Sequence, residues 1–188
     1  MLKKIICFLQ KPVFYAIGVT YGMSVKLKNS IMKKTPQSVQ NNSFEYAIRT
    51  PESEKEWDDY YFLRWKILRS DFSDDIDSAK DELENQSYHV AVIHSNKEVI
   101  GIGRLHDVDE QTSQIRYMAV DKDSRRHSFG TKILLNLIQH AKDNDKKYII
   151  LHARENAVKF YKNNGFELLE KSHLLFDKIQ HYLMKISL

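Results

Sequence analysis

The sequence predicts an α/β protein built on a mixed, mostly antiparallel sheet of six to seven strands flanked by helices, and three observations support this fold class. Short runs alternate apolar and polar residues, as strands with one buried face do. Other segments repeat apolar residues every three or four positions, as amphipathic helices do. One helical segment separates two apolar runs that could pair in parallel, whereas short turns join other neighbouring strands.

The first expected elements are a strand and a helix. Residues 44–48 alternate between apolar and polar or small side chains, as a half-buried strand does. Ser53 and Glu56 have the spacing of a capping box, so they predict the start of a helix. This helix is expected to end near Asp71, and the polar stretch 73–86 to contain a second, weaker helix.

The middle of the chain is expected to form three strands and a long helix. Residues 88–93 and 99–105 flank a polar turn and predict a hairpin, and 114–120 predict the next strand. A charged loop follows, and then a helix with one apolar face: Ile133, Leu134, Leu137, Ile138 and Ala141.

The remaining elements are a strand, a short helix and two closing strands. Residues 148–153 are largely apolar, which is typical of a strand buried on both faces. The helix predicted over 156–163 should stop at Asn164 and Gly165, which suit a C-terminal cap. Alternation returns over 182–186.

The composition limits the classes of function. With 188 residues, the chain has room for one ordinary domain and an appendage. Its single cysteine, Cys7, excludes an internal disulfide framework, and no metal site is expected. Seven of the 29 basic residues precede Phe44, where no acidic residue occurs, so 22 remain against 25 acidic ones. A folded part that leans acidic is a poor nucleic-acid binder, and no such partner is expected.

The chain is expected to divide into a basic leader, 1–43, and a domain, 44–188. The apolar stretch 13–23 is short for a membrane span, and no clean signal-peptide cleavage site follows it. The leader is either disordered, an artefact of a start codon that truly lies at Met23 or Met32, or a targeting or membrane-surface segment. We expect a cytoplasmic protein, with organelle targeting or membrane association through the leader as the alternative.

One segment has the character of a phosphate site. The strand predicted over 114–120 runs into a loop containing Arg125 and Arg126, and this loop opens an amphipathic helix. Free backbone amides and the positive end of the helix dipole bind phosphate at such a place, and arginines add charge. The alternative is a solvated basic loop before an ordinary helix.

These residues resemble the GNAT acetyltransferase superfamily, whose loop motif is Arg/Gln-x-x-Gly-x-Gly/Ala. Arg125 and Gly130 match its first and last places, whereas Ser128 stands at the middle glycine and Arg126 where a small residue is common. If position 128 needs a positive φ, serine costs about 1 kcal/mol there and weakens cofactor binding by up to about tenfold. Its hydroxyl could instead bind the phosphate.

A second segment strengthens the resemblance. Residues 153–166 are similar to the family run N-x-x-A-x-x-F-Y-x-x-x-G-F, although Arg154 replaces its asparagine and Asn156 follows two residues later. The residues in register are Ala157, Phe160, Tyr161, Gly165 and Phe166. Residues 101–106 and the helix around 63–69 resemble one GNAT subgroup, so the match covers about three quarters of the chain.

The resemblance implies a GNAT fold, acetyl-CoA as co-substrate without a metal, and transfer of its acetyl group to a primary amine of a small molecule or peptide. It also implies a possible homodimer. The residues expected to hold the cofactor are Met118, Ala119 and Val120 on the strand, Arg125, Arg126, His127, Ser128, Phe129, Gly130 and Thr131 in the loop, and Arg154 or Asn156. The alternative function is a non-catalytic module that binds CoA through a degenerate loop.

The resemblance also implies the catalytic groups. Tyr161 stands where the family often places the general acid that returns a proton to the CoA thiolate, and the alternative is a core tyrosine. His106 is the candidate general base, although a lone histidine is more often structural. Arg64, Trp65 and Arg69 fall on the helix where the family binds the acceptor, and they suggest an acceptor that bears a carboxylate. The alternative is that these arginines are only solvated.

Overall fold

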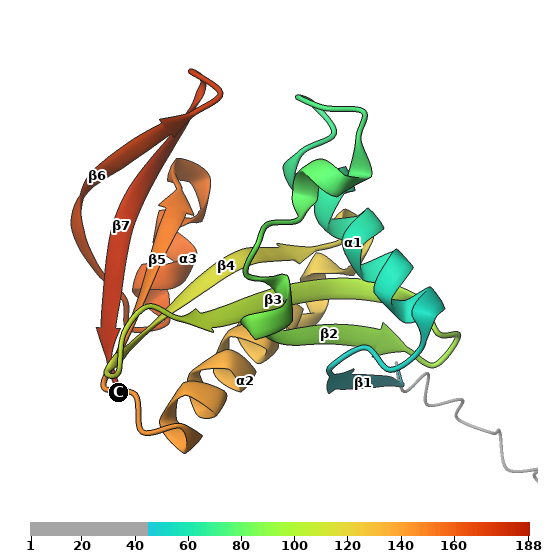
Figure 1. Cartoon of the computed structure of the whole chain (residues 1–188), viewed down its shortest axis with the longest axis horizontal. Helices are drawn as coiled ribbons and strands as arrows, with labels where there is room; N and C mark the ends of the chain where they lie inside the picture. Colours follow the sequence, from blue (N-terminus) through green and yellow to red (C-terminus); the bar gives the residue numbers. More distant parts are fainter. Residues whose placement is uncertain (1–44) are drawn as a thin grey trace, which may run out of the picture. The chain divides into compact units, whose positions relative to one another are not determined.

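The computed structural model describes residues 45–188, so the predictions made for the leader lie outside the described residues. Within them, seven strands form one sheet in the order β1-β2-β3-β4-β5-β7-β6, antiparallel except between β4 and β5 (Figure 1). The elements are β1 (Tyr46–Arg49), α1 (Glu54–Leu68), η1 (Ile76–Ala79), η2 (Glu84–Gln86), β2 (Tyr88–His94), β3 (Val99–Asp107), β4 (Thr112–Val120), η3 (Lys122–His127), α2 (Phe129–Asp143), β5 (Tyr148–Arg154), η4 (Glu155–Ala157), α3 (Val158–Asn163), β6 (Glu167–Leu175) and β7 (Ile179–Ser187).

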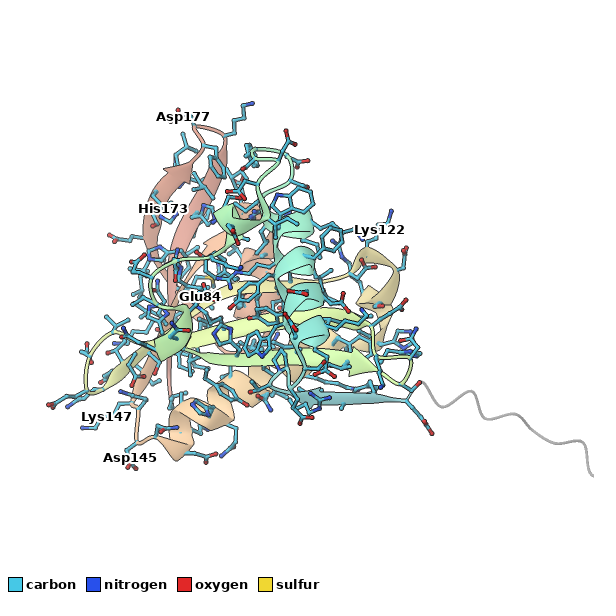
Figure 2. The ribbon with its side chains drawn as sticks, turned by 45° about the vertical axis from the view of Figure 1, so that its right-hand side comes forward. Glu84, Lys122, Asp145, Lys147, His173 and Asp177 are labelled. Atoms are coloured by element: carbon cyan, nitrogen blue, oxygen red, sulfur yellow. The ribbon has the colours of Figure 1, made fainter. Side chains whose placement is uncertain are left out.

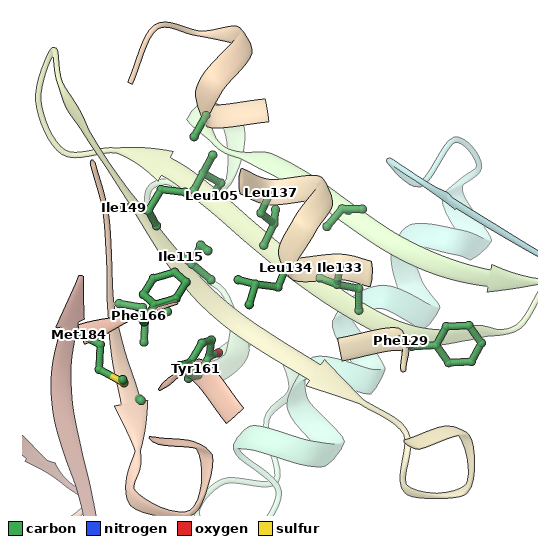
Figure 3. Packing of buried hydrophobic residues seen from close by; sticks show 14 of the residues in the cluster. Leu105, Ile115, Phe129, Ile133, Leu134, Leu137, Ile149, Tyr161, Phe166 and Met184 are labelled. Atoms are coloured by element: carbon green, nitrogen blue, oxygen red, sulfur yellow. The ribbon is translucent and has the colours of Figure 1, made fainter. Parts of the chain in front are cut away.

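The two long helices lie on opposite faces of the sheet. Tyr60 and Leu63 of α1 pack on one face, in a cluster with Ile102 and Ala119. The apolar side of α2 packs on the other face in the larger core, which α3 also joins (Figures 1 and 3). We call these the α1 face and the α2 face.

Two glycines of β3 explain how closely α2 lies on the sheet. A Cβ at Gly101 would stand 2.9 Å from Ile133 Cδ1, and a Cβ at Gly103 would stand 2.6 Å from Ile133 Cγ2. Because real Cβ atoms do not approach so closely, side chains at these places would push α2 away from β3. The expected apolar face of this helix is confirmed, with Ile133, Leu134 and Leu137 fully buried.

The capping box of α1 is present with one change. The Ser53 hydroxyl accepts a hydrogen bond from the Glu56 amide at 3.2 Å, as predicted, but the Glu56 carboxylate accepts from the Glu52 amide and from Arg49. The helix ends at Leu68, three residues before the predicted end.

The weaker helix expected within 73–86 does not form. Two short 3-10 turns, η1 and η2, stand in its place. The Asp75 side chain accepts a hydrogen bond from the Asp77 amide, a local bond that competes with a continuous helix.

The prediction that β5 is buried on both faces is wrong. Ile149, Leu151 and Ala153 are buried on the α2 face, whereas Tyr148, Ile150, His152 and Arg154 on the α1 face are half-buried. Within the described residues α1 packs mainly against β3 and β4, and it reaches β5 on this side through the hydrogen bond from Arg154 to the Leu68 carbonyl. One face of β5 is therefore left for other contacts.

Candidate functional site

The parallel strands β4 and β5 separate partway along their length. They pair only from Thr112 with Tyr148 to Ile115 with Leu151, and beyond that point they diverge (Figure 1). We call the diverging ends, residues 116–120 of β4 and 152–154 of β5, the fork. A sheet normally satisfies the backbone polar groups of its inner strands, so a fork leaves such groups for a ligand.

The orientation of the β4 amides follows from one hydrogen bond. The Asp121 amide donates to the Ile100 carbonyl at 2.9 Å, which makes these residues a hydrogen-bonded pair. Antiparallel ladders alternate, so Ala119 also bonds to β3, whereas the amides of Val120 and Met118 point away from it. Those two amides face the fork, where residues 45–188 provide no strand partner for them.

A bulge gives β4 its bend beside the fork. The register with β3 shifts between Ile102 and Arg104, and Tyr117 in this stretch has a φ of 56°. The Tyr117 ring lies under the guanidinium of Arg64, 3.4 Å from its centroid, and its hydroxyl donates to Asp81. These contacts hold a tyrosine in a backbone conformation that side chains rarely adopt.

The loop that was predicted to bind phosphate leads directly into α2, and its binding of phosphate stays a prediction. It makes the 3-10 turn η3, and Ser128 then adopts the left-handed conformation, with φ 57° and ψ 24°, immediately before α2. The Lys132 amide returns to the Ser128 carbonyl at 3.1 Å, so the amides of Phe129, Gly130 and Thr131 precede the first intrahelical bond. The first turn contains no acidic residue, which favours an anion there.

Two side chains of this loop, those of Arg125 and Ser128, are exposed. The Ser128 hydroxyl does not cap α2, although it stands at the cap position. Arg125 is exposed, and the His127 ring lies 5.5 Å from the Phe129 ring. The sequence left open whether position 128 needs a positive φ, and Ser128 has one, 57°.

Tyr161 connects the core with the fork. It lies in α3 among buried apolar side chains, with its ring 5.6 Å from that of Phe166 (Figure 3). Its hydroxyl lies 3.8 Å from the sulfur of Met118, the residue whose amide faces the fork. Burial raises the pKa of Tyr161, so the phenol keeps its proton at neutral pH. A thioether is a weak acceptor, which leaves that proton available.

His106 lies at the closed end of the fork. It pairs with Gln114 of β4, one residue before the last β4–β5 pair, and it is 8% exposed. Its Nδ1 has no hydrogen-bond partner among the described residues. Burial lowers the pKa of His106, and the nearby cations Arg104 and Arg116 lower it further. The imidazole is therefore neutral at neutral pH and able to accept a proton.

The residues predicted for the acceptor behave differently from one another. Arg64 is fully buried, and both of its terminal nitrogens donate to Glu84. The Trp65 indole donates to the Ser73 carbonyl at 2.7 Å. Arg69 donates to the Leu68 carbonyl at 3.1 Å, beside the fork. Arg64 and Trp65 thus hold the surrounding segments in place, and their predicted contact with an acceptor stays a prediction.

Arg154 and Asn156 follow the β5 end of the fork. The Arg154 guanidinium crosses to α1 and donates to the Leu68 carbonyl at 2.9 Å, whereas Asn156 in η4 is exposed. Arg154 and Asn156 are the two alternatives for the cofactor contact. Since the Arg154 side chain is bound to α1, Asn156 is the one whose side chain is available for a ligand.

Sequence reasoning missed a charged network under α1. Asp81 binds Arg104 and Arg116, and Glu84 binds Arg64 and Arg104. Two interactions within the network hold the pKa of Asp81 well below its usual range: the hydrogen bond from Arg104 and the charge of that guanidinium. Both acids come from a polar stretch without periodicity, so the sequence offered no signal for their place.

Comparison with known proteins decides the family. A model of the acetyltransferase (GNAT) domain matches residues 50–188. The chain belongs to the GNAT family of N-acetyltransferases. It is 28% identical over 132 residues to the "uncharacterized N-acetyltransferase YjcF" of Bacillus subtilis, which covers 70% of this chain and 93% of that protein.

Two solved GNAT structures share the fold. An aminoglycoside 6'-N-acetyltransferase complexed with coenzyme A matches with a TM-score of 0.64 and 11% identity, over 76% of this chain and 96% of that one. A GNAT family acetyltransferase from Elizabethkingia anophelis with acetyl-CoA bound matches with a TM-score of 0.57 and 15% identity, over 78% and 99%. The predicted fold class and the GNAT resemblance are confirmed.

Two further observations concern the described part of this GNAT chain. No helix within residues 45–188 is both long and apolar enough to cross a membrane. The same residues contain no group of three His, Cys, Asp or Glu side chains placed to hold a metal ion.

Proposed function

We propose that the chain transfers the acetyl group of acetyl-CoA to a primary amine, by direct attack of the amine on the thioester. The observation that carries the proposal is the fork, with amides of β4 directed into it and the Tyr161 hydroxyl beside Met118. Family membership supports acetyl transfer in general, and the geometry of the fork supports the residue roles proposed below.

The residues fit a CoA thioester at two places. The unpaired amides of Met118 and Val120 suit an extended amide-bearing arm that lies in the fork as an added strand would. The first amides of α2 and the left-handed Ser128 suit its pyrophosphate, and Arg125 adds positive charge. Asn156 is the side chain proposed to contact the arm from the β5 side.

Two residues of this chain would handle protons. His106 is neutral and has a free nitrogen, so it can accept the proton of the attacking amine, directly or through water. Tyr161 keeps its proton and can donate it to the departing sulfur. The Met118 amide would stabilise the negative charge that develops on the thioester oxygen.

One observation favours the second candidate, a module that binds CoA without catalysis. The left-handed position 128 is a serine, where the family has glycine, so the loop departs from the catalytic pattern. A CoA titration paired with an assay of thiol release separates the two candidates, because only an enzyme releases the thiol when an amine is added.

The test of the proposed function has two readouts. Acetyl-CoA at one hundred times its dissociation constant should stabilise the protein by about 2.7 kcal/mol, measured as a thermal shift. Amines from several chemical classes should then be screened by release of the CoA thiol. No shift at millimolar acetyl-CoA would contradict binding, and a shift without thiol release for any amine would favour the non-catalytic module.

A further inference from the structure

Two arginines from distant parts of the chain converge on one backbone carbonyl. Arg69 follows α1, and Arg154 ends β5, yet both donate to the Leu68 oxygen, at 3.1 Å and 2.9 Å. The carbonyls at a helix C-terminus carry partial negative charge, which accounts for part of this attraction. Each guanidinium has five N–H donors, so one carbonyl leaves most of them for other partners.

These two arginines lack the partners that the other arginines of the interior have. The other buried or half-buried arginines of residues 45–188 each form an ion pair with a carboxylate: Arg49, Arg64, Arg104 and Arg116. Within the same residues no carboxylate lies within 4.0 Å of Arg69 or Arg154; the Asp71 carboxylate acts on Arg154 only from a longer distance, and Arg69 interacts with the Tyr117 hydroxyl. Burial lowers the pKa of both, which expresses the cost of keeping their charges partly out of water.

Aromatic rings from two segments border the site of these two guanidiniums. Phe72 stacks on Phe176 with 4.3 Å between ring centroids, which joins the loop after α1 to the turn between β6 and β7. The Arg69 guanidinium lies 5.6 Å from the Phe176 ring and 5.7 Å from the Tyr117 ring. Figure 2 shows this turn, marked by Asp177, beside the loop that follows α1.

The anion that suits this pair is not the one proposed for the cofactor. The pyrophosphate place, at the start of α2, lies on the α2 face of the sheet. Arg154 alternates with Ala153, which is buried on the α2 face, so its side chain lies on the α1 face. A ligand anion at Arg69 and Arg154 would therefore meet the fork from the side opposite the pyrophosphate.

We propose that the acceptor is a primary amine that also carries an anionic group, a carboxylate or a phosphate, which Arg69 and Arg154 bind on the α1 face of the fork. The inference rests on the acetyl transfer proposed above. Guanidiniums outnumber carboxylates on this side: Arg64, Arg69, Arg104, Arg116 and Arg154 stand against Asp71, Asp81 and Glu84. This positive excess also favours the neutral, nucleophilic form of an amine over its ammonium form. Polycationic amines are disfavoured for the same reason.

The experiment compares amines that differ in one substituent. The first series is β-alanine, aminoethyl phosphate, ethanolamine and ethylenediamine, which share an aminoethyl unit and end in a carboxylate, a phosphate, a hydroxyl and an ammonium. The second pairs amino acids with their carboxamides. The anionic members should have a kcat/KM about tenfold or more above the neutral ones, and the two anions are distinguished by which is preferred.

Variants tie this preference to the two arginines. Arg69→Gln and Arg154→Gln should lower the ratio of kcat/KM for anionic amines to kcat/KM for neutral amines about tenfold, whereas Arg154→Lys should keep part of the preference. Lys147→Gln removes an exposed cation just before β5, at the end away from the fork, and should not change this ratio. A thermal shift with acetyl-CoA verifies that each variant is folded. If a variant does not fold, the amine series with the parent protein still decides whether anionic acceptors are preferred.

The outcomes separate this inference from the function on which it rests. If no amine of either series is acetylated but the wider amine screen finds an acceptor, the inference fails and acetyl transfer stands; if the wider screen also finds none, both fail. If neutral or dicationic amines are acetylated as well as the anionic ones, the anionic acceptor is wrong and acetyl transfer stands. If the anionic preference survives both glutamine variants, another group binds the anion and the assignment to this pair is wrong.

Discussion

Ile115 and Leu151 are the last residues at which β4 and β5 pair. Beyond them the sheet opens, and the groups assigned to acetyl transfer gather around that opening. His106 pairs with Gln114, the residue before Ile115. The Tyr161 hydroxyl contacts the sulfur of Met118 in the fork. Backbone groups left unpaired at this opening are free to bind a ligand, which is why we propose it as the place of acetyl transfer.

Ser128→Gly should tighten acetyl-CoA binding or leave it unchanged. Glycine adopts the observed φ of 57° without the β-carbon penalty of about 1 kcal/mol. Asp145→Gly is the matched control, since Asp145 has the same φ in the turn after α2. The free energy of unfolding of both variants should equal that of the parent protein or be slightly higher. Calorimetric titration with acetyl-CoA measures the affinity.

The contrary result at this position is informative. If Ser128→Gly weakens acetyl-CoA more than tenfold and Asp145→Gly does not, the serine hydroxyl binds the phosphate. The serine would then be a ligand and not only a tolerated departure from the family loop.

The sequence predicted those parts of the molecule whose cause is local. The apolar face of α2 and the hairpin of β2 and β3 each depend on residues within one short segment. The capping of α1 by Ser53 is of the same kind. Local pattern was sufficient because each of these features is settled by spacing or by a single backbone conformation.

The parts that sequence reasoning missed depend on contacts between distant segments. Burial of β5 on both faces was expected from its apolar sequence alone. The sequence does not show that α1 packs mainly on β3 and β4 and leaves one face of β5 half-buried. Likewise Asp81 joins Arg104 and Arg116 across the sheet, and Arg154 reaches Leu68 over 86 positions of sequence. For Arg64 the alternative of a merely solvated arginine is wrong, because Glu84 holds it in the interior. No periodicity signals such partners.

Removal of residues 1–43 should leave a folded and active domain. The sheet begins with β1 at Tyr46, and the family match begins at residue 50, so each assigned group lies after the cut. Thermal unfolding and release of the CoA thiol should match those of the full chain. An insoluble or inactive product would show instead that the leader contributes to the folded domain or to an interface.

His106 should set the acid side of the pH profile. Its pKa is lowered from 6.5, chiefly by burial, so it is unprotonated at neutral pH and gains a proton only on further acidification. If it is the base, kcat/KM should fall with decreasing pH through a pKa below 6.5. His106→Gln should lower the rate and remove this limb.

His140 provides the control for this assignment. Burial also lowers the pKa of His140, but this residue lies on α2, where its ring stacks on that of Tyr88 with 3.7 Å between the centroids. His140→Gln should keep the acid limb. A limb that persists in His106→Gln would assign the base to another group or to water.

Tyr161→Phe should lower turnover by about 10²-fold or more with little change in acetyl-CoA affinity. The ring and its packing survive, so a tyrosine that is only structural loses one weak hydrogen bond, about 1 kcal/mol at most. A general acid also loses the proton it must deliver, and such groups contribute roughly 10² to 10⁴ in rate.

Tyr88→Phe is the matched control, because the Tyr88 hydroxyl donates to Asn136 at 2.9 Å, away from the fork. It should lose a similar amount of stability and keep the parent turnover. The comparison requires single-turnover conditions, in which product release does not limit the measured rate, with the affinity for acetyl-CoA determined separately. If Tyr161→Phe acetylates the amine at the parent rate under these conditions, its hydroxyl delivers no proton, and Tyr161 is a core residue that happens to border the fork.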